Sequence, residues 1–252
     1  MASGGAGSFT RMWQRMLATA LASAFLAVGA ASCGSAGTAG TSAGSKANPL
    51  ATLSADQIAS KAVADLKTAA AVHVAGSVID SGQRTSMNLT LMHGKGCDGS
   101  VSMPHEVSFL LIRIGTAVWL KPDDQFWKTS GATDPAVLKI LAGKYLKTSA
   151  KSTLGGLSAL CDISKLFGSS FKNPTGIVKG KDATISGQPA LEIKDAKDSG
   201  SAYVSVSARP QLLRLIGTGS NAGQLDFTGY GTSVTLTAPP ASQTLDGAKY
   251  GF

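Results

Sequence analysis

The chain has 252 residues, of which 43% are hydrophobic and 15% are charged, and it carries a net charge of +8 at neutral pH. This apolar fraction excludes a disordered protein, and the length suits one domain of about 200 residues with a sizeable core. The positive charge raises the question of nucleic-acid binding, which depends on where the charges lie.

Residues 1–32 have the order of a secretory signal peptide. Arg11 and Arg15 precede an uncharged run from Met16 to Ala31, and small residues then lead to Cys33. The run has 16 residues, fewer than the ~20 that a membrane-spanning helix needs. We therefore expect cleavage rather than a retained span.

The residues around the cleavage point resemble a bacterial lipobox, with Ala30 in place of the usual Leu, and predict that Cys33 is lipidated. The alternative is ordinary cleavage nearby, which leaves a free Cys33. Residues 33–49 are mostly Gly, Ser, Ala and Thr and predict a flexible tether. Because two acyl chains hold a protein stably on a bilayer, we expect a lipid-anchored protein on the extracytoplasmic face of the cell membrane.

One domain is expected over residues 50–252, with a loose tail from about residue 241. It begins with a helix, because Ser54 and Gln57 form a capping box and an apolar stripe runs from Ile58 to Ala70 at helical spacing. Two later helices are predicted, one after Asp134-Pro135 that ends at Gly143 and one over residues 156–168.

The rest of the domain alternates apolar and polar residues, which is typical of an antiparallel sheet with one apolar face. The predicted strands are 72–80, 84–92, 96–103, 107–115, 116–121, 176–185, 189–195, 201–207, 212–217, 223–230 and 233–239. The strand over 107–115 is apolar on both faces and is expected to be central or covered on both sides.

Two cysteines remain in the predicted domain. An exported chain meets an oxidising compartment, so Cys97 and Cys161 are expected to form a disulfide between the third strand and the last helix. Free buried thiols and metal ligands are the alternatives. Metal binding is disfavoured because the histidines stand alone and no CxxC or HxxxH spacing occurs.

Catalytic motifs are missing from the sequence. It has no GxSxG, P-loop, GxGxxG, HExxH or calcium-loop pattern. Asp123 and Asp124 lie near Trp119 and Trp127, as paired acids and aromatic residues do in a glycosidase, but solvated acids beside core tryptophans are the favoured interpretation. We expect neither enzymatic activity nor a metal or cofactor.

The positive charge is concentrated in one segment. Arg11 and Arg15 leave with the signal peptide, and residues 139–181 hold eight lysines against Asp162 alone. On a tethered protein such a segment suits anionic lipid headgroups rather than nucleic acid. Candidate contacts with the membrane surface are Lys139, Lys144, Lys147, Lys151 and Lys165. The alternative is a set of solvated lysines without a ligand.

The order of these elements resembles the actinobacterial lipoproteins of the LppX/LprAFG group. The similar segments are VHVAGSVID, MNLTLMHGKGCDGSV, FLLIRIGTAVWLK and, as a last strand, FTGYGTSVTLTAP. The resemblance covers most of residues 50–240. It implies an α+β fold in which helices cover the concave apolar face of a strongly curved antiparallel half-barrel, as in LolA/LolB-like carriers. It also implies an apolar cavity for acyl chains or lipid tails.

Candidate lining residues are the apolar positions of the sheet and its helical cover. They are Met87, Leu89, Leu91, Val101, Met103, Phe109, Leu111, Val118, Leu120, Leu138, Leu141, Leu160 and Phe167. Each of them also fits a plain packed core. The sequence thus predicts a monomeric lipid carrier or binder; the alternative is an envelope sensor or protein-interaction module without lipid cargo.

Overall fold

The computed structural model describes residues 48–80, 82–129, 134–152, 154–167, 176–195, 200–232 and 234–250. The predicted signal peptide, Cys33 and residues 33–47 of the predicted tether therefore lie outside the described residues. In the described part, no helix is long and apolar enough to cross a membrane.

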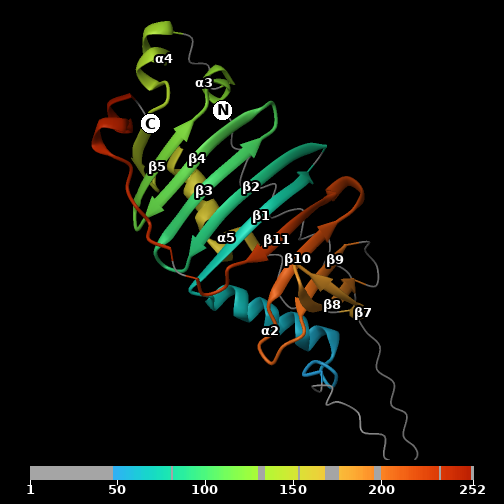
Figure 1. The fold of residues 1–252 in the computed structure, drawn as a ribbon. Coiled ribbons are helices and arrows are strands. Elements are labelled where there is room, and N and C mark those ends of the chain that lie inside the picture. Colours follow the sequence, from blue (N-terminus) through green and yellow to red (C-terminus); the bar gives the residue numbers. More distant parts are fainter. Residues whose placement is uncertain are drawn as a thin grey trace, which may run out of the picture.

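A single sheet of twelve strands dominates the fold (Figure 1). Its order is β12-β6-β5-β4-β3-β2-β1-β11-β10-β9-β8-β7, and every pairing is antiparallel except the parallel β12–β6 pair. The strands are β1 Ala71–Asp80, β2 Gln83–Met92, β3 Gly96–Met103, β4 Val107–Ile114, β5 Ala117–Pro122, β6 Tyr145–Ser149, β7 Ile177–Ile185, β8 Gln188–Asp195, β9 Ser201–Ser205, β10 Leu212–Gly217, β11 Gly223–Thr228 and β12 Thr244–Asp246.

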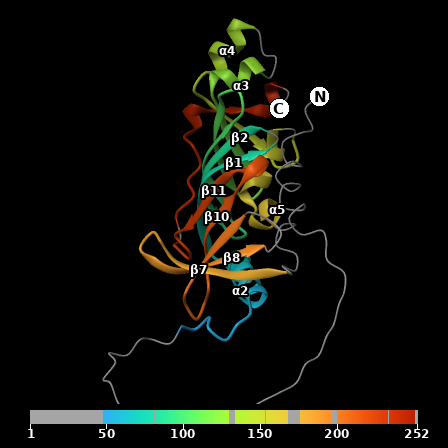
Figure 2. The ribbon, with the colours of Figure 1, turned by 90° about the vertical axis from the view of Figure 1, so that its right-hand side faces the viewer.

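The predicted α+β class is confirmed, but the predicted strong curling into a half-barrel is not. The sheet stays open, with β12 and β7 as its two edges. Strands β7 and β8 are turned well away from the direction of β1 (Figure 2). This is the accumulated twist that an open sheet of many strands develops, and it replaces the expected rolling of the sheet around a lumen.

Short helices complete the described fold. They are the α-helices α2 Ala55–Thr68, α3 Asp124–Thr129, α4 Pro135–Leu141 and α5 Ile163–Phe167, and the 3₁₀ helices η2 Leu154–Cys161, η3 Gly219–Asn221, η4 Ala241–Gln243 and η5 Gly247–Tyr250. Helices α2 and α5 lie on the same side of the sheet (Figure 2), and η2 packs against β2–β6.

Helix α2 begins where the capping box predicts. The Ser54 hydroxyl accepts a hydrogen bond from the Gln57 amide at 3.2 Å, and the Gln57 side chain accepts one from the Ser54 amide at 2.9 Å. These bonds satisfy N–H groups that a helix start leaves without partners. The helix then buries Ile58 and Leu66 completely, so the predicted stripe faces the core.

The region predicted as one helix over 156–168 is instead two short ones. Helix η2 ends at Cys161, and α5 begins at Ile163. Between them the Asp162 carboxylate accepts hydrogen bonds from the amides of Ser164 at 2.9 Å and Lys165 at 3.2 Å. Because such side-chain bonds mark a helix start, Asp162 restarts the chain as a new helix.

The C-terminal region differs from its predicted course. The strand expected over 233–239 is wrong, because residues 234–240 form no strand. Both edges of β11 are already paired, with β1 and with β10, so that part of the sheet offers no free edge. The tail expected to be loose contains β12, in which Leu245 lies opposite Leu146 of β6.

Gly99 allows the close approach of β3 to β2. A side chain there would place its Cβ 2.0 Å from the Asn88 carbonyl oxygen, and the residue has φ +152°. Only glycine fits such a contact. The apolar layer therefore continues across β3 without a side chain at this position.

Candidate functional site

The nine candidate lining residues of the sheet all lie on one face, which we call the apolar face. Residues directly opposite in a ladder point to the same side of a sheet, and Leu89, Gly99, Leu111 and Leu120 form one such row across β2–β5. The nine belong to one hydrophobic cluster: Met87, Leu89, Leu91, Val101, Met103, Phe109, Leu111, Val118 and Leu120. All are buried except Met103, which is partly buried.

Helices α2, η2 and α5 form a cover on this face. Helix α2 lies against β7, β9 and β10, while η2 lies against β2–β6. The predicted cover residue Leu160 packs on the same cluster, with Leu157, Ile163 and Leu166 beside it. The cover therefore consists of two pieces from distant parts of the chain, each serving one half of the sheet.

The predicted disulfide is present and fastens the second piece. Cys97 of β3 is bonded to Cys161 at the end of η2, with their Cα atoms 5.1 Å apart. Both cysteines are buried in the cluster. One covalent link thus holds the junction of η2 and α5 against the middle of the apolar face.

Two predicted cover residues lie elsewhere. Leu138 and Leu141 of α4 pack in a separate small cluster with Trp127 and Leu146. Helix α4 projects beyond the end of the sheet instead of lying on it (Figure 1), so these two residues do not face the apolar layer. The side chain of Phe167, another predicted cover residue, lies outside the described residues.

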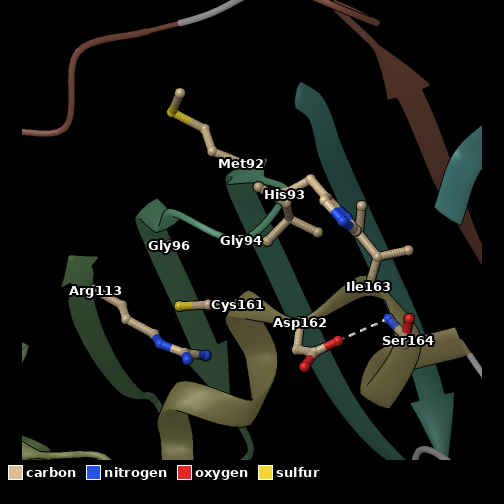
Figure 3. A pocket seen from close by; sticks show the side chains of 10 residues that line it. Met92, His93, Gly94, Gly96, Arg113, Cys161, Asp162, Ile163 and Ser164 are labelled. Carbon is tan, nitrogen blue, oxygen red and sulfur yellow. Dashed lines mark hydrogen bonds between the residues drawn. The ribbon is translucent and has the colours of Figure 1, made fainter. Parts of the chain in front are cut away.

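A pocket of about 290 Å³ opens at the edge of the cover, and we call it the mouth pocket (Figure 3). It lies beside the β2–β3 turn, where the His93 amide donates to the Ala70 carbonyl at 3.1 Å. Its walls include Leu91 and Ile163, which belong to the main cluster, together with polar residues. The full lining is Leu91, Met92, His93, Gly94, Gly96, Arg113, Cys161, Asp162, Ile163 and Ser164.

Arg113 is a charged member of this lining on the apolar face itself. It lies opposite Cys97 on β3 and Val118 on β5, both of which are buried. Its Nε donates to the Gly115 carbonyl at 2.9 Å, and one terminal nitrogen donates to the Ser158 carbonyl at 3.4 Å. Arg113 is not among the residues that the sequence predicts for the lining, although its parity with Phe109 and Leu111 places it on the same face.

The five lysines expected to contact a membrane do not share one face; they are Lys139, Lys144, Lys147, Lys151 and Lys165. Lys165 is exposed on α5, on the covered side of the sheet. Lys147 lies over the Trp119 ring, 5.8 Å from its centroid, and Trp119 pairs with Ile112 on the opposite face. Lys144 donates to the Ser242 carbonyl at 2.9 Å.

The opposite face is partly covered by the C-terminal segment. A surface hollow of about 700 Å³ lies between Trp119, Lys147 and residues of this segment, among them Pro239 and Asp246. On this face Ile112 and Trp119 are buried, whereas Leu110 is 40% exposed. The strand predicted over 107–115 is therefore covered on its second face only in part.

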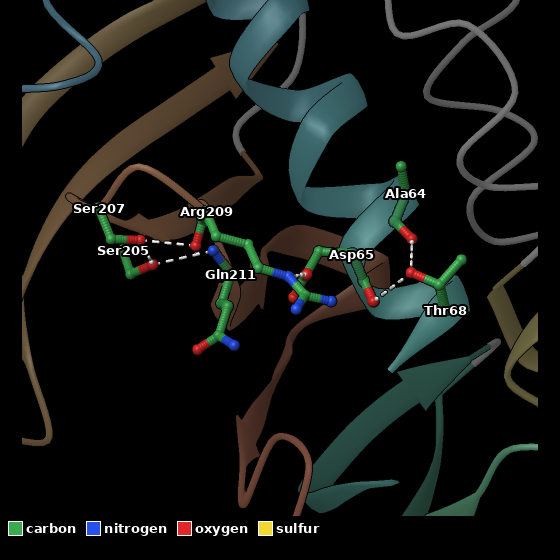
Figure 4. A network of polar contacts seen from close by, with 7 residues as sticks. All are labelled: Ala64, Asp65, Thr68, Ser205, Ser207, Arg209 and Gln211. Carbon is green, nitrogen blue, oxygen red and sulfur yellow. Dashed lines mark hydrogen bonds and ion pairs between the residues drawn. The ribbon is translucent and has the colours of Figure 1, made fainter. Parts of the chain in front are cut away.

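An ion pair between a buried carboxylate and an exposed guanidinium fastens the first piece of the cover (Figure 4). Asp65 of α2 is paired with Arg209 in the β9–β10 loop. The loop is braced from within, because the Ser205 hydroxyl accepts from the Gln211 amide at 2.8 Å and the Ser207 hydroxyl donates to the Arg209 carbonyl at 2.6 Å. Helix α2 is thus tied to the far half of the sheet.

Tyr230 lies close to this ion pair. Its hydroxyl donates to the Leu212 carbonyl at 2.7 Å. Burial raises the pKa of Tyr230 far above its ordinary value, and the negative charge of Asp65 raises it further. The phenol is therefore neutral at physiological pH and serves as a hydrogen-bond donor.

Asp123, considered above as a solvated acid, instead caps a helix that the sequence analysis missed. Its carboxylate accepts from the Phe126 amide at 2.7 Å and from the amide and hydroxyl of Ser108, both at 2.7 Å. Burial raises the pKa of Asp123, but the Ser108 hydroxyl and the backbone amides of Phe126, Ser108 and Gln125 lower it more, so the net shift is downward. The signal for α3 was present, since Asp is a preferred N-cap residue.

The described residues contain no group of three or more His, Cys, Asp or Glu that could hold a metal ion. His73, one of the isolated histidines, contacts the Thr90 hydroxyl through its Nδ1 at 3.1 Å.

Comparison with known proteins gives structural matches only. No protein-family model and no curated protein matches the sequence. LprF from Mycobacterium bovis is similar with a TM-score of 0.48 and 11% identity, over 73% of this chain and 96% of that one. The Mycobacterium tuberculosis lipoprotein LppX is similar with a TM-score of 0.45 and 16% identity, over 73% and 98%.

A more distant match is the MucA/MucB complex of Pseudomonas aeruginosa, with a TM-score of 0.29 and 9% identity, over 75% of this chain and 59% of that one. LprF and LppX are members of the lipoprotein group that the sequence resembles.

Proposed function

We propose that the chain is a membrane-anchored extracytoplasmic lipoprotein that binds the acyl chain of a lipid or other amphiphile between its sheet and its cover. The observation that carries the proposal is the mouth pocket, whose walls include Leu91 and Ile163 of the buried apolar layer. A ligand at this place contacts polar residues of the rim and the apolar side chains of Leu91 and Ile163 together. Binding is by burial, with no bond made or broken.

The size of the mouth pocket sets a condition on this mechanism. Its volume of about 290 Å³ is at the lower end of the ~300–1,000 Å³ that ligand pockets span. A long acyl chain therefore requires η2 and α5 to move away from the sheet. Each methylene of the ligand that is buried between the cover and the sheet stabilises the complex by about 0.8 kcal/mol. This gain offsets the cost of separating η2 and α5 from the sheet.

The cover piece that has to move is locally weak. Helix η2 runs for eight residues, whereas 3₁₀ helices have poor hydrogen-bond geometry and rarely exceed three or four residues. Leu157 and Leu160 are only partly buried against the sheet. Segments with few buried contacts open at low free-energy cost, and the disulfide keeps the opened piece attached at Cys161.

The membrane contact is proposed for the side of the sheet that carries the cover. A planar bilayer meets one face at a time, and Lys165 lies exposed beside the mouth pocket, next to its lining residue Ser164. Lipidation of Cys33 supplies the anchor. Replacing Cys33 with Ser is expected to release the protein from the membrane fraction, and continued retention contradicts the anchor.

The binding proposal is tested on the Cys33→Ser chain. Native mass spectrometry and lipid extraction are expected to find a co-purifying amphiphile, or uptake of an added fluorescent fatty acid. Leu160→Asp places a carboxylate beside the acyl chain and is expected to weaken uptake at least about tenfold. The matched control is Ile140→Asp, because Ile140 is 48% exposed on α4.

Equal uptake by both variants contradicts a site under the cover. A wild-type protein that carries no lipid and takes up none overturns the proposal. In that case the alternative of an envelope sensor or interaction module without lipid cargo is favoured.

A further inference from the structure

We propose that Arg113 makes the mouth pocket selective for a single-chain amphiphile with an anionic head, such as a carboxylate or a phosphate. The inference rests on the proposed function and adds the class of ligand. In the row formed by Cys97, Arg113 and Val118, a charged residue lies between two buried apolar residues of the sheet.

The guanidinium is held in place by carbonyl groups. Its two hydrogen bonds run to Gly115 and Ser158, and among the described residues no carboxylate lies within the 4.0 Å of an ion pair. Its remaining N–H donors have no acceptor in the described part of the chain. A partly buried cation without a counter-ion attracts an anion, because few charges around it compensate its own.

The other charged groups around the mouth pocket are one acid and several bases. The Asp162 carboxylate forms no ion pair with Arg113 and accepts from the amides of Ser164 and Lys165 at the start of α5, where it keeps its negative charge. His93 is exposed at the rim, and Lys95 and Lys165 are exposed nearby. The charged groups around the mouth are thus mostly basic, which favours an anionic head over a neutral or cationic one.

The residues next to Arg113 determine where the chain of the ligand lies. A guanidinium binds a carboxylate or phosphate through two parallel hydrogen bonds, and the walls next to Arg113 are Leu91, Cys161 and Ile163. A head bound at Arg113 therefore points its chain under the cover. The volume of about 290 Å³ accommodates one small head, which favours a single-chain ligand over a bulky glycolipid.

The test compares probes that differ only in head charge. Binding of hexadecanoate, hexadecyl phosphate and methyl hexadecanoate to the Cys33→Ser chain is measured by competition with a fluorescent fatty acid. The two anionic probes are expected to bind at least about tenfold more tightly than the ester. Arg113→Gln is expected to remove this preference, so that the affinity ratio of acid to ester falls to about one, while Arg113→Lys retains part of it because charge survives without the two-bond geometry.

The matched control is Arg84→Gln, because Arg84 is exposed and donates to the Ser77 hydroxyl at 2.7 Å on the β1–β2 hairpin. Equal affinity of wild-type protein for acid and ester overturns the inference and leaves the proposed function intact. Failure to bind any probe overturns both. If Arg113→Gln does not fold, the dependence of wild-type affinity on salt decides, since an anionic head at Arg113 loses affinity with rising salt and the ester does not.

Discussion

Arg209 and Asp65 form an ion pair in which one side chain is 72% exposed and the other only 5% exposed. The second carboxylate oxygen of Asp65 has no hydrogen-bond partner among the described residues. Among the described residues, Arg209 is therefore the charged partner of Asp65, and it reaches this carboxylate from the β9–β10 loop on the solvent side.

Replacing Arg209 with Gln is expected to lower the free energy of unfolding by about 2 kcal/mol, because a buried carboxylate loses its charged partner. Urea unfolding at neutral pH measures the loss. The double variant with Asp65→Asn is expected to recover part of it, because no charge then stays buried. A double variant that is less stable than Arg209→Gln alone contradicts this account of the pair.

Removing the disulfide is expected to destabilise the fold and loosen η2 and α5. The two cysteines are 64 residues apart, and in the chain-entropy model a link of this length is worth about 4 kcal/mol. The variant with both Cys97→Ser and Cys161→Ser is compared with wild type by thermal unfolding, with and without reductant. Reductant is expected to lower the midpoint of the wild type only, and a shift of the double variant contradicts the assignment.

Acid is expected to weaken the attachment of α3 through Asp123. The pKa of this carboxyl is lowered in the folded protein from an ordinary value of 3.8. Because the folded pKa lies below the unfolded one, the stability contribution of Asp123 is complete above about pH 4 and is lost as the pH falls through the folded pKa.

Ser108→Ala removes one hydrogen bond to Asp123 and is expected to cost about 1–2 kcal/mol at neutral pH. Below the folded pKa the cost is expected to shrink, since a protonated Asp123 is a weaker acceptor. Urea midpoints measured for both proteins from pH 7 down to pH 2 check this. A difference between the two proteins that is independent of pH contradicts the role of the charged carboxylate.

Vesicle binding by variants of Lys165 and Lys147 tests which face of the sheet contacts the membrane. Lys165→Gln is expected to weaken binding of the Cys33→Ser chain to vesicles of anionic phospholipid by several-fold, since each lysine near the surface contributes about 1 kcal/mol. Lys147→Gln, on the opposite face, is the control and is expected to leave binding unchanged. Weaker binding by Lys147→Gln together with unchanged binding by Lys165→Gln contradicts a membrane contact on the side of the cover.

Local signals account for the elements that the sequence predicts well. Helix α2 begins at its capping box, α4 begins after Asp134, whose carboxylate accepts from the Ala136 amide at 2.8 Å, and β3 has its predicted bounds. Within each strand, the predicted lining residues share one face because alternate residues of a strand point to the same side. These features depend on neighbours within a few residues.

The remaining features depend on partners far along the chain. Strand β6 has a short, lysine-containing sequence and is recognisable only through its pairing with β5 and β12. Leu138 and Leu141 have the spacing of cover residues, but α4 lies beyond the sheet because Trp127 and Leu146 offer a separate place to pack. Arg113 as the charged group of the mouth pocket emerges only when the β2–β3 turn, β4 and α5 are brought together.

The pairing of β1 with β11 has a consequence for how the chain reaches its fold. Strands β1–β6 follow one another in the sheet in their chain order, and so do β7–β11, so each set forms from contacts between neighbours in sequence. The seam between the sets joins His73 to Thr228, and pairings this distant are slow to form. We expect two independent meanders early in folding and a late step that closes the seam between them.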